Sequence, residues 1–198
     1  MLSINAQVAL APEGTYRRLV AEPARVRWWH ALARPALVLL VMAVALPVMA
    51  VRTITVQLVF VSAAAWSLVV LVQIAMALPT IAWAPGRTVS VPRALDLWFA
   101  GHLPYSAWIL LLPVITSIRP DLPALNMMAI TFAVPTVWTT FIITAFCRRV
   151  LGAMPAGARW RAALHQVVSI AVVVTLALWA AGGLASVTSY ILRMLGRN

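Results

Sequence analysis

Long apolar segments constrain the fold of this chain more than any other feature of its sequence. Of the 198 residues, 64% are hydrophobic and only 10% are charged, whereas a soluble domain carries about 25% charged residues. A hydrocarbon core of roughly 30 Å requires about 20 helical residues to cross it. The sequence therefore predicts an all-α fold, a polytopic transmembrane helical bundle with about five spans.

The predicted spans are separated by short connections that contain arginine, proline or glycine. They form one membrane domain over residues 35–190, preceded by residues 1–34 and followed by a tail, 191–198. Because the first apolar segment follows a charged stretch and is too long for a signal peptide, we expect it to be retained as a span. The predicted spans are residues 35–51, 55–78, 94–118, 125–146 and 162–186.

The N-terminal segment is basic and rich in tryptophan. Residues 1–12 lack periodicity and predict a loose tail, and residues 13–34 predict two short helical pieces divided at Pro23. Alternating arginine and apolar residues are typical of an amphipathic helix in the headgroup layer. A cytoplasmic tail that merely precedes the first span is the alternative. The expected interfacial anchors are Arg17, Arg18, Trp28, Trp29 and Trp160.

All 15 basic residues are arginines, and their distribution predicts an orientation. Eleven lie on the side of the N-terminus and four on the opposite side. Arginines in short loops stay in the cytoplasm, so the N-terminus should be cytoplasmic and the C-terminus outside. The predicted aromatic belt at the inner side includes Trp83 and Trp98. The bias toward arginine and alanine indicates a GC-rich bacterial genome, and together with the predicted spans we expect a multi-pass protein of the bacterial inner membrane.

The net charge of +11 raises the alternative of a nucleic-acid partner. The arginines flank the apolar segments, where membrane anchors are expected. The predicted partners are therefore the lipid bilayer and other integral membrane proteins, in an oligomer or a complex, with no nucleic acid.

Asp96 is the acidic residue that lies in a predicted span. A charge at membrane depth costs at least about 2.5 kcal/mol, so it usually faces a partner or a cavity. Arg93 lies three residues earlier, and we expect the two to pair in the first turn of span 94–118. A proton or cation site at Asp96 is the weaker alternative.

His102 lies deeper in the same span, six residues after Asp96. This spacing places the two side chains on different faces of a regular helix, and a neutral His102 bonded to a neighbouring helix is the favoured interpretation. His30 and His165 are expected at the inner boundary. The chain contains neither an HExxH motif nor a histidine pair at i, i+4, either of which would indicate a metal site. No cofactor is therefore predicted. A pigment or haem contact through His102 or His30 is the weaker alternative.

Two further features concern packing and chemistry. Gly182 and Ser186 form a small-xxx-small pattern, which allows close helix contact. Cys147 lies beside Arg148 and Arg149 at the inner boundary, where an unmodified thiol is favoured over acylation. No nucleophile elbow, phosphate-binding loop or dinucleotide fingerprint occurs, so we predict no catalytic residues and no enzymatic activity.

Two stretches carry a family resemblance. They are TYRRLVAEPARVRWWHALARPALVLL (Thr15 to Leu40) and VPRALDLWFAGHLPYSAWILLLPVI (Val91 to Ile115). With this layout, the chain resembles bacterial relatives of the YIP-type (Ypt/Rab-interacting protein) membrane domain family. The resemblance implies five spans, a cytoplasmic N-terminus and a scaffold or membrane-organising role. The acidic, glycine- and proline-containing pattern of the eukaryotic members is absent here, so no GTPase or vesicle role follows.

Three functional hypotheses are compatible with these patterns. The first is a non-enzymatic integral membrane protein that binds other membrane proteins or organises the bilayer. The second is an accessory subunit of a larger bioenergetic or photosynthetic complex. The third is a small transporter or channel that uses Asp96 and the proline-interrupted spans.

Overall fold

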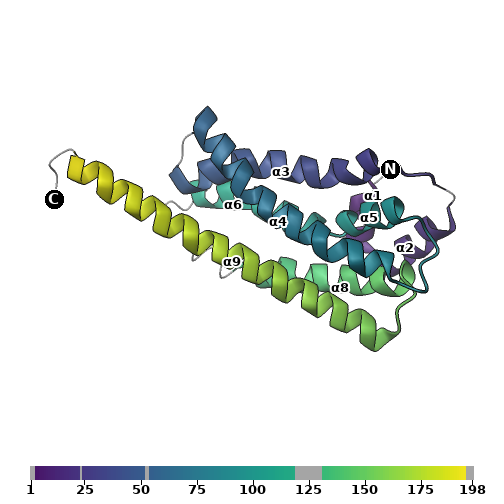
Figure 1. Cartoon of the computed structure of the whole chain (residues 1–198). Helices are drawn as coiled ribbons and strands as arrows, with labels where there is room; N and C mark the ends of the chain where they lie inside the picture. The colour runs from purple at the N-terminus through teal and green to yellow at the C-terminus, as the bar shows by residue number, and fades with distance from the viewer. Residues whose placement is uncertain (1–2, 23, 52–53, 119–130, 195–198) are drawn as a thin grey trace.

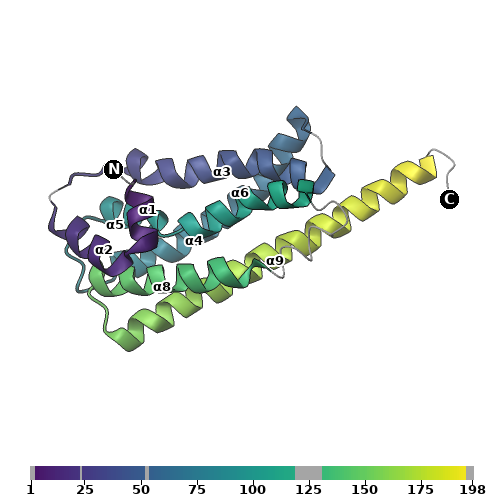
Figure 2. The same ribbon diagram turned by 180° about the vertical axis from the view of Figure 1, so that it is seen from behind.

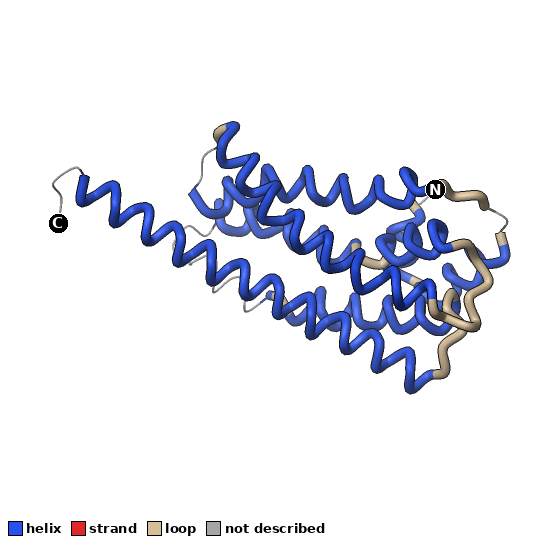
Figure 3. The backbone as a smooth tube through the Cα atoms, viewed as in Figure 1, coloured by secondary structure: helices blue, strands red, loops and turns tan. Residues whose placement is uncertain are grey.

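The computed structural model describes residues 3–22, 24–51, 54–118 and 131–194, and this part of the chain consists of helices and connecting loops (Figure 3). The all-α prediction is therefore confirmed for the described residues. The helices are α1 (Ile4–Leu10), α2 (Pro12–Ala21), α3 (Trp28–Val51), α4 (Val56–Ala82), α5 (Val91–Ala100), α6 (Leu103–Ile118), α8 (Ala133–Arg149) and α9 (Pro155–Met194).

The long helices run side by side, and the short ones gather at one end. In Figures 1 and 2, α1, α2 and α5 lie at the end where α3 begins and where α4 and α8 end. The helix α9 runs the full length of the bundle and extends past the other helices at the opposite end. We call the end where α3 begins the arginine end, because the N-terminal segment and the loops after α4 and α8, which are rich in arginine, all lie there.

The core lies at the arginine end. Its fully buried side chains come from α1, α2, α5, α8, the first turn of α3, the last turns of α4 and the first turns of α9. Trp98 on α5 is 1% exposed and contacts Phe146 edge-on, with ring centroids 5.3 Å apart. The prediction that Trp98 belongs to an interfacial belt is wrong, because this side chain packs between helices.

Local sequence signals explain where several helices begin. The Ser3 side chain accepts a hydrogen bond from the Ala6 amide at 3.3 Å, and the Thr55 side chain accepts one from the Leu58 amide at 3.2 Å. These are N-caps, which satisfy amides that have no partner inside the helix. Pro12 is the first residue of α2 and Pro92 the second residue of α5, where the backbone N–H has no partner inside the helix and its absence costs nothing.

The N-terminal segment differs from its prediction. Residues 4–10 are helical rather than a loose tail, and Val8 is fully buried. A helix this short is stabilised by tertiary packing rather than by its own propensity. The break near Pro23 is confirmed on its N-terminal side, since Glu22 has the extended φ of −77° and ψ of 121° that a following proline favours.

The predicted span 94–118 is divided into α5 and α6 at Gly101 and His102. A Cβ atom at Gly101 would lie 2.9 Å from Ile142 Cγ2 and 3.1 Å from the Tyr16 hydroxyl. Only glycine lets α5 end this close to α2 and α8. Pro104 follows in the first turn of α6, where proline is tolerated.

The loops after α4 and α8 touch at the arginine end. A Cβ atom on Gly152 would lie 2.9 Å from the Gly86 Cα, and Gly152 has φ +65°, a conformation that glycine adopts without steric cost. This contact confirms that the loops predicted on one side of the bundle lie together.

Two helical segments of the described chain are long and apolar enough to cross a membrane, Trp28–Ala45 and Val56–Ala82. A shorter apolar helix covers Leu103–Leu112. The predicted span 125–146 corresponds to α8 only from Ala133 onward, and residues 125–130 lie outside the described part.

Candidate functional site: buried polar contacts at the arginine end

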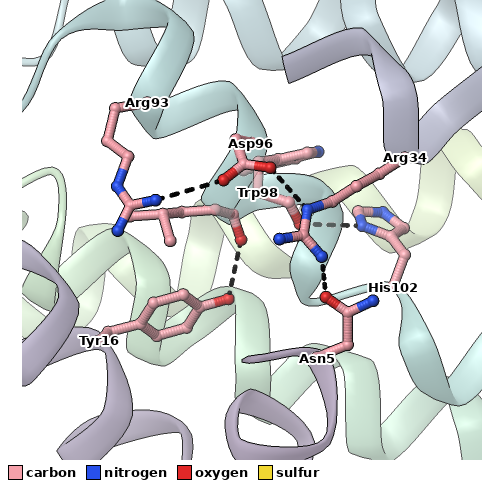
Figure 4. A network of polar contacts seen from close by, with 8 residues as sticks. Asn5, Tyr16, Arg34, Arg93, Asp96, Trp98 and His102 are labelled. Atoms are coloured by element: carbon pink, nitrogen blue, oxygen red, sulfur yellow. Dashed lines mark hydrogen bonds and ion pairs between the residues drawn. The ribbon is translucent and has the colours of Figure 1, made fainter. Parts of the chain in front are cut away.

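The most charged group of buried side chains joins α3 to α5 (Figure 4). Asp96 Oδ1 accepts a hydrogen bond from Arg34 Nε at 2.6 Å, and Asp96 Oδ2 accepts one from Arg93 Nη1 at 3.4 Å. The Arg34 guanidinium also donates to Asn5 Oδ1 on α1. The Asp96 side chain is 10% exposed and that of Arg93 is 9% exposed. One carboxylate thus holds two guanidinium groups and links α3 to α5, and the Arg34–Asn5 contact adds α1.

The pairing of Asp96 with Arg93 confirms the prediction from their spacing. Asp96 lies in the second turn of α5 rather than the first, because the helix begins at Val91. The shorter contact, to Arg34, was missed because the two residues are 62 positions apart. The signal was present as an arginine directly before the first predicted span, 35–51. With both carboxylate oxygens engaged, this group has the geometry of an internal ion pair.

A second contact ties α2 to α5. The Tyr16 hydroxyl donates a hydrogen bond to the Leu97 carbonyl at 3.1 Å, as Figure 4 shows. The Tyr16 ring is fully buried and meets Phe146 edge-on at 5.7 Å between centroids. Burial raises the pKa of Tyr16 above its ordinary value of 10.0, because an ionised phenol would lose its hydration there.

This environment predicts a pH dependence. Because the Tyr16 pKa is higher in the folded state, its contribution to stability is complete below pH 10 and is lost as the pH rises through the folded pKa. We expect the Tm in detergent to fall above pH 10, and to fall less steeply in Tyr16→Phe. The same substitution should cost about 1 kcal/mol at neutral pH through the lost hydrogen bond. Parallel pH profiles for the two proteins would contradict this account.

His102 and His165 form a pair between the start of α6 and α9. Their Nε2 atoms lie 3.1 Å apart, and His102 Nδ1 lies 3.1 Å from the Trp98 carbonyl. Since a carbonyl only accepts, His102 Nδ1 carries the proton, and its neutral ring accepts from His165 Nε2. The prediction that His102 is bonded to a neighbouring helix is confirmed. The prediction that His165 is interfacial is wrong, because this residue is 1% exposed.

The histidine pair does not extend to a metal site. Within the described residues, no group of three or more histidine, cysteine, aspartate or glutamate side chains lies close enough to hold a metal ion. The second ring nitrogen of His165, Nδ1, is buried without a hydrogen-bond partner. His30 is exposed at the start of α3 and lies beside Trp29.

Glu13 fastens the N-terminal helices to the end of α8. Its carboxylate accepts a hydrogen bond from Arg148 Nη1 at 2.9 Å and another from Arg149 Nε. Trp138 on α8 donates its indole N–H to the Ala9 carbonyl at 2.8 Å. The apolar side of α2, which includes Leu19, is buried in the core. It is therefore covered by protein and is not free to enter the headgroup layer as the interfacial-helix prediction requires.

The other predicted positions divide into exposed, buried and undescribed ones. The anchors Trp28, Trp29 and Trp160 are 50%, 59% and 70% exposed, and Arg17 and Arg18 lie on the outer face of α2. Cys147 is fully buried, in agreement with an unmodified thiol. The side chains around Gly182 and Ser186 lie outside the described part of the structure, so the small-residue contact stays a prediction.

Comparisons of the chain with protein-family models, with curated proteins and with solved structures found no match. The YIP-type resemblance therefore stays a prediction from the two stretches that carry it.

Proposed function

We propose that this chain is a multi-span integral membrane protein that acts by binding other membrane proteins or organising the bilayer, without catalysis. The bundle would have five spans, with the N-terminus in the cytoplasm of a bacterial cell and the C-terminus outside. This is the role that the YIP-type resemblance implies. The observation that carries the proposal is the uncovered apolar surface of α4.

The helix α4 is apolar around its whole circumference, yet little of it is buried. Of its 27 residues, only Val69, Ala77 and Ile81 are buried, while Phe60 and Val61 are 71% and 65% exposed. A soluble protein rarely exposes a contiguous apolar surface of this kind. Hydrocarbon chains, or the apolar helices of another membrane protein, are the surroundings that this surface suits.

Other helices repeat this pattern and support additional spans. Leu111 on α6, Phe141 on α8 and Val167 on α9 are each at least half exposed. At the arginine end, by contrast, exposed tryptophans lie beside arginines, as in the Arg27 guanidinium over the Trp29 ring at 4.9 Å. Amphipathic rings and arginines are typical of the cytoplasmic interface. This arrangement supports an orientation with the arginine end inside.

The polar contacts weigh against the two alternatives. In a transporter, Asp96 would need an unoccupied oxygen for a proton or cation, but both oxygens face guanidinium groups. In a pigment-binding subunit, His102 would need a free ring nitrogen, but both of its nitrogens have partners. A binding role requires neither group to be free.

The proposal is tested by purifying the tagged chain in mild detergent from membranes of its native host. We expect it to resist extraction by alkaline carbonate, to be colourless, and to retain a stoichiometric membrane-protein partner or a defined lipid shell. The double substitution Phe60→Ala and Leu71→Ala, which truncates two exposed side chains of α4, should reduce the amount of partner or lipid that is retained. Trp83→Phe, at a position after the helix, should not change it. Release by carbonate, or a turnover or ion flux that depends on Asp96, would contradict the proposal.

A further inference from the structure

A cavity lies inside the bundle, away from the charged cluster at Asp96. It has a volume of about 70 Å³ and lies between α3, α4, α6 and α9, with Phe132 on one side. A second pocket of about 40 Å³ adjoins it and shares the lining residues Trp66, Gln73, Tyr105 and Ile109. Ligand sites in proteins commonly have mostly apolar walls with a small number of polar groups.

Two polar atoms in the wall of this cavity have no partner. The indole nitrogen of Trp66 and the hydroxyl of Ser169 are buried without a hydrogen bond, and both residues line the larger pocket. Ser169 as a whole is 8% exposed. A buried polar group without a partner costs about 1 to 3 kcal/mol. Because the indole nitrogen only donates, an occupant that satisfies it must carry an acceptor atom.

The rest of the wall restricts the occupant further. The larger pocket is lined mainly by aromatic and aliphatic side chains, among them Trp108, Ile109 and Phe132, and no charged residue of the described part of the chain lines it. Arg34 lines the smaller pocket, but its guanidinium is engaged by Asp96 and Asn5. The Tyr105 hydroxyl lies 2.9 Å from Gln166 Oε1. A charged headgroup would thus find no free counter-charge here.

We propose that the cavity between α3, α4, α6 and α9 binds the carbonyl-bearing end of a neutral, mostly hydrocarbon molecule, whose carbonyl oxygen accepts from Trp66 and Ser169. A ring ketone with an alkyl tail, as in a lipid quinone, has this chemistry. The acyl ester of a neutral glycerolipid has it as well. Either molecule partitions into a bilayer. The inference goes beyond the scaffold role and requires no protein partner.

The test is a titration of the purified full chain in detergent with decylubiquinone and, separately, with dioleoylglycerol. The Tm should rise with the concentration of at least one probe. Trp66→Phe and Ser169→Ala should each raise the Kd about tenfold, the equivalent of about one hydrogen bond. Ile109→Trp should abolish the shift by filling the cavity. Trp160→Phe, at an exposed position, should leave the Kd unchanged.

The two probes identify the source of the carbonyl. A shift with decylubiquinone alone assigns a quinone-like ring, and a shift with dioleoylglycerol alone assigns an acyl ester. If Ile109→Trp does not fold, the two smaller substitutions decide the result. The absence of a shift with either probe, or an unchanged Kd in both Trp66→Phe and Ser169→Ala, would overturn the proposal. Retention of a protein partner is measured separately, so this failure is distinguishable from failure of the scaffold role.

Discussion

Replacing Asp96 by asparagine is expected to lower the free energy of unfolding by about 3 kcal/mol, because it leaves the buried Arg93 and the partly buried Arg34 without their counter-charge. The Asp96 carboxylate accepts from Arg34 at 2.6 Å and from Arg93 at 3.4 Å. It thereby joins the start of α3 to α5. The loss is measured by denaturant titration of the purified protein in detergent, with helical content as the signal.

A surface ion pair of the same chain provides the matched control. Arg18 and Glu22 lie 3.6 Å apart at i, i+4, with side chains 56% and 54% exposed, and such pairs contribute about 0.5 kcal/mol or less. Glu22→Gln should therefore have almost no effect. Arg34→Met combined with Asp96→Asn should be less destabilising than the sum of the single changes, since both remove the same contact. Equal losses in Asp96→Asn and Glu22→Gln would contradict the internal ion pair.

Truncation of Trp98 to alanine should be similarly damaging, at about 3 to 5 kcal/mol, because it opens a large cavity in a packed interior. The Trp98 ring lies edge-on to Phe146 and to His165, with centroids 5.3 Å and 4.9 Å away. The Trp98 indole nitrogen is buried without a hydrogen-bond partner, so Trp98→Phe should cost less than Trp98→Ala.

The control is again a residue of the same type. Trp83 follows α4 and is 82% exposed, so Trp83→Ala should change the free energy of unfolding by less than about 0.5 kcal/mol. Denaturant titration of the three variants gives the order of their stabilities. A loss at Trp83 that equals the loss at Trp98 would place both rings in the interface, as the aromatic-belt prediction had it.

Local features of the fold could be read from the sequence. The apolar runs predicted where α3 and α4 lie, and Pro23 predicted a break in the chain. The spacing of Arg93 and Asp96 predicted their contact, because residues three apart on a helix are neighbours. In each case the signal lies within a few positions of the feature that it predicts.

Contacts between distant segments could not be read in this way. The partners Arg34 and Asp96 are separated by 62 positions, and His102 and His165 by 63, so only the packing of the helices brings them together. Burial of Trp98 was missed for a related reason. In an apolar span, hydropathy does not distinguish a side that faces lipid from a side that faces another helix.

The most direct test of a five-span bundle is the location of the C-terminus. An odd number of spans and a cytoplasmic N-terminus place it outside, so alkaline phosphatase fused after Asn198 should be active and green fluorescent protein at that site should be dark. Fusions made after Gly86, in the loop that follows α4, should show the reverse and serve as the control. A fluorescent C-terminal fusion with inactive phosphatase would mean an even number of crossings and would contradict the proposed topology.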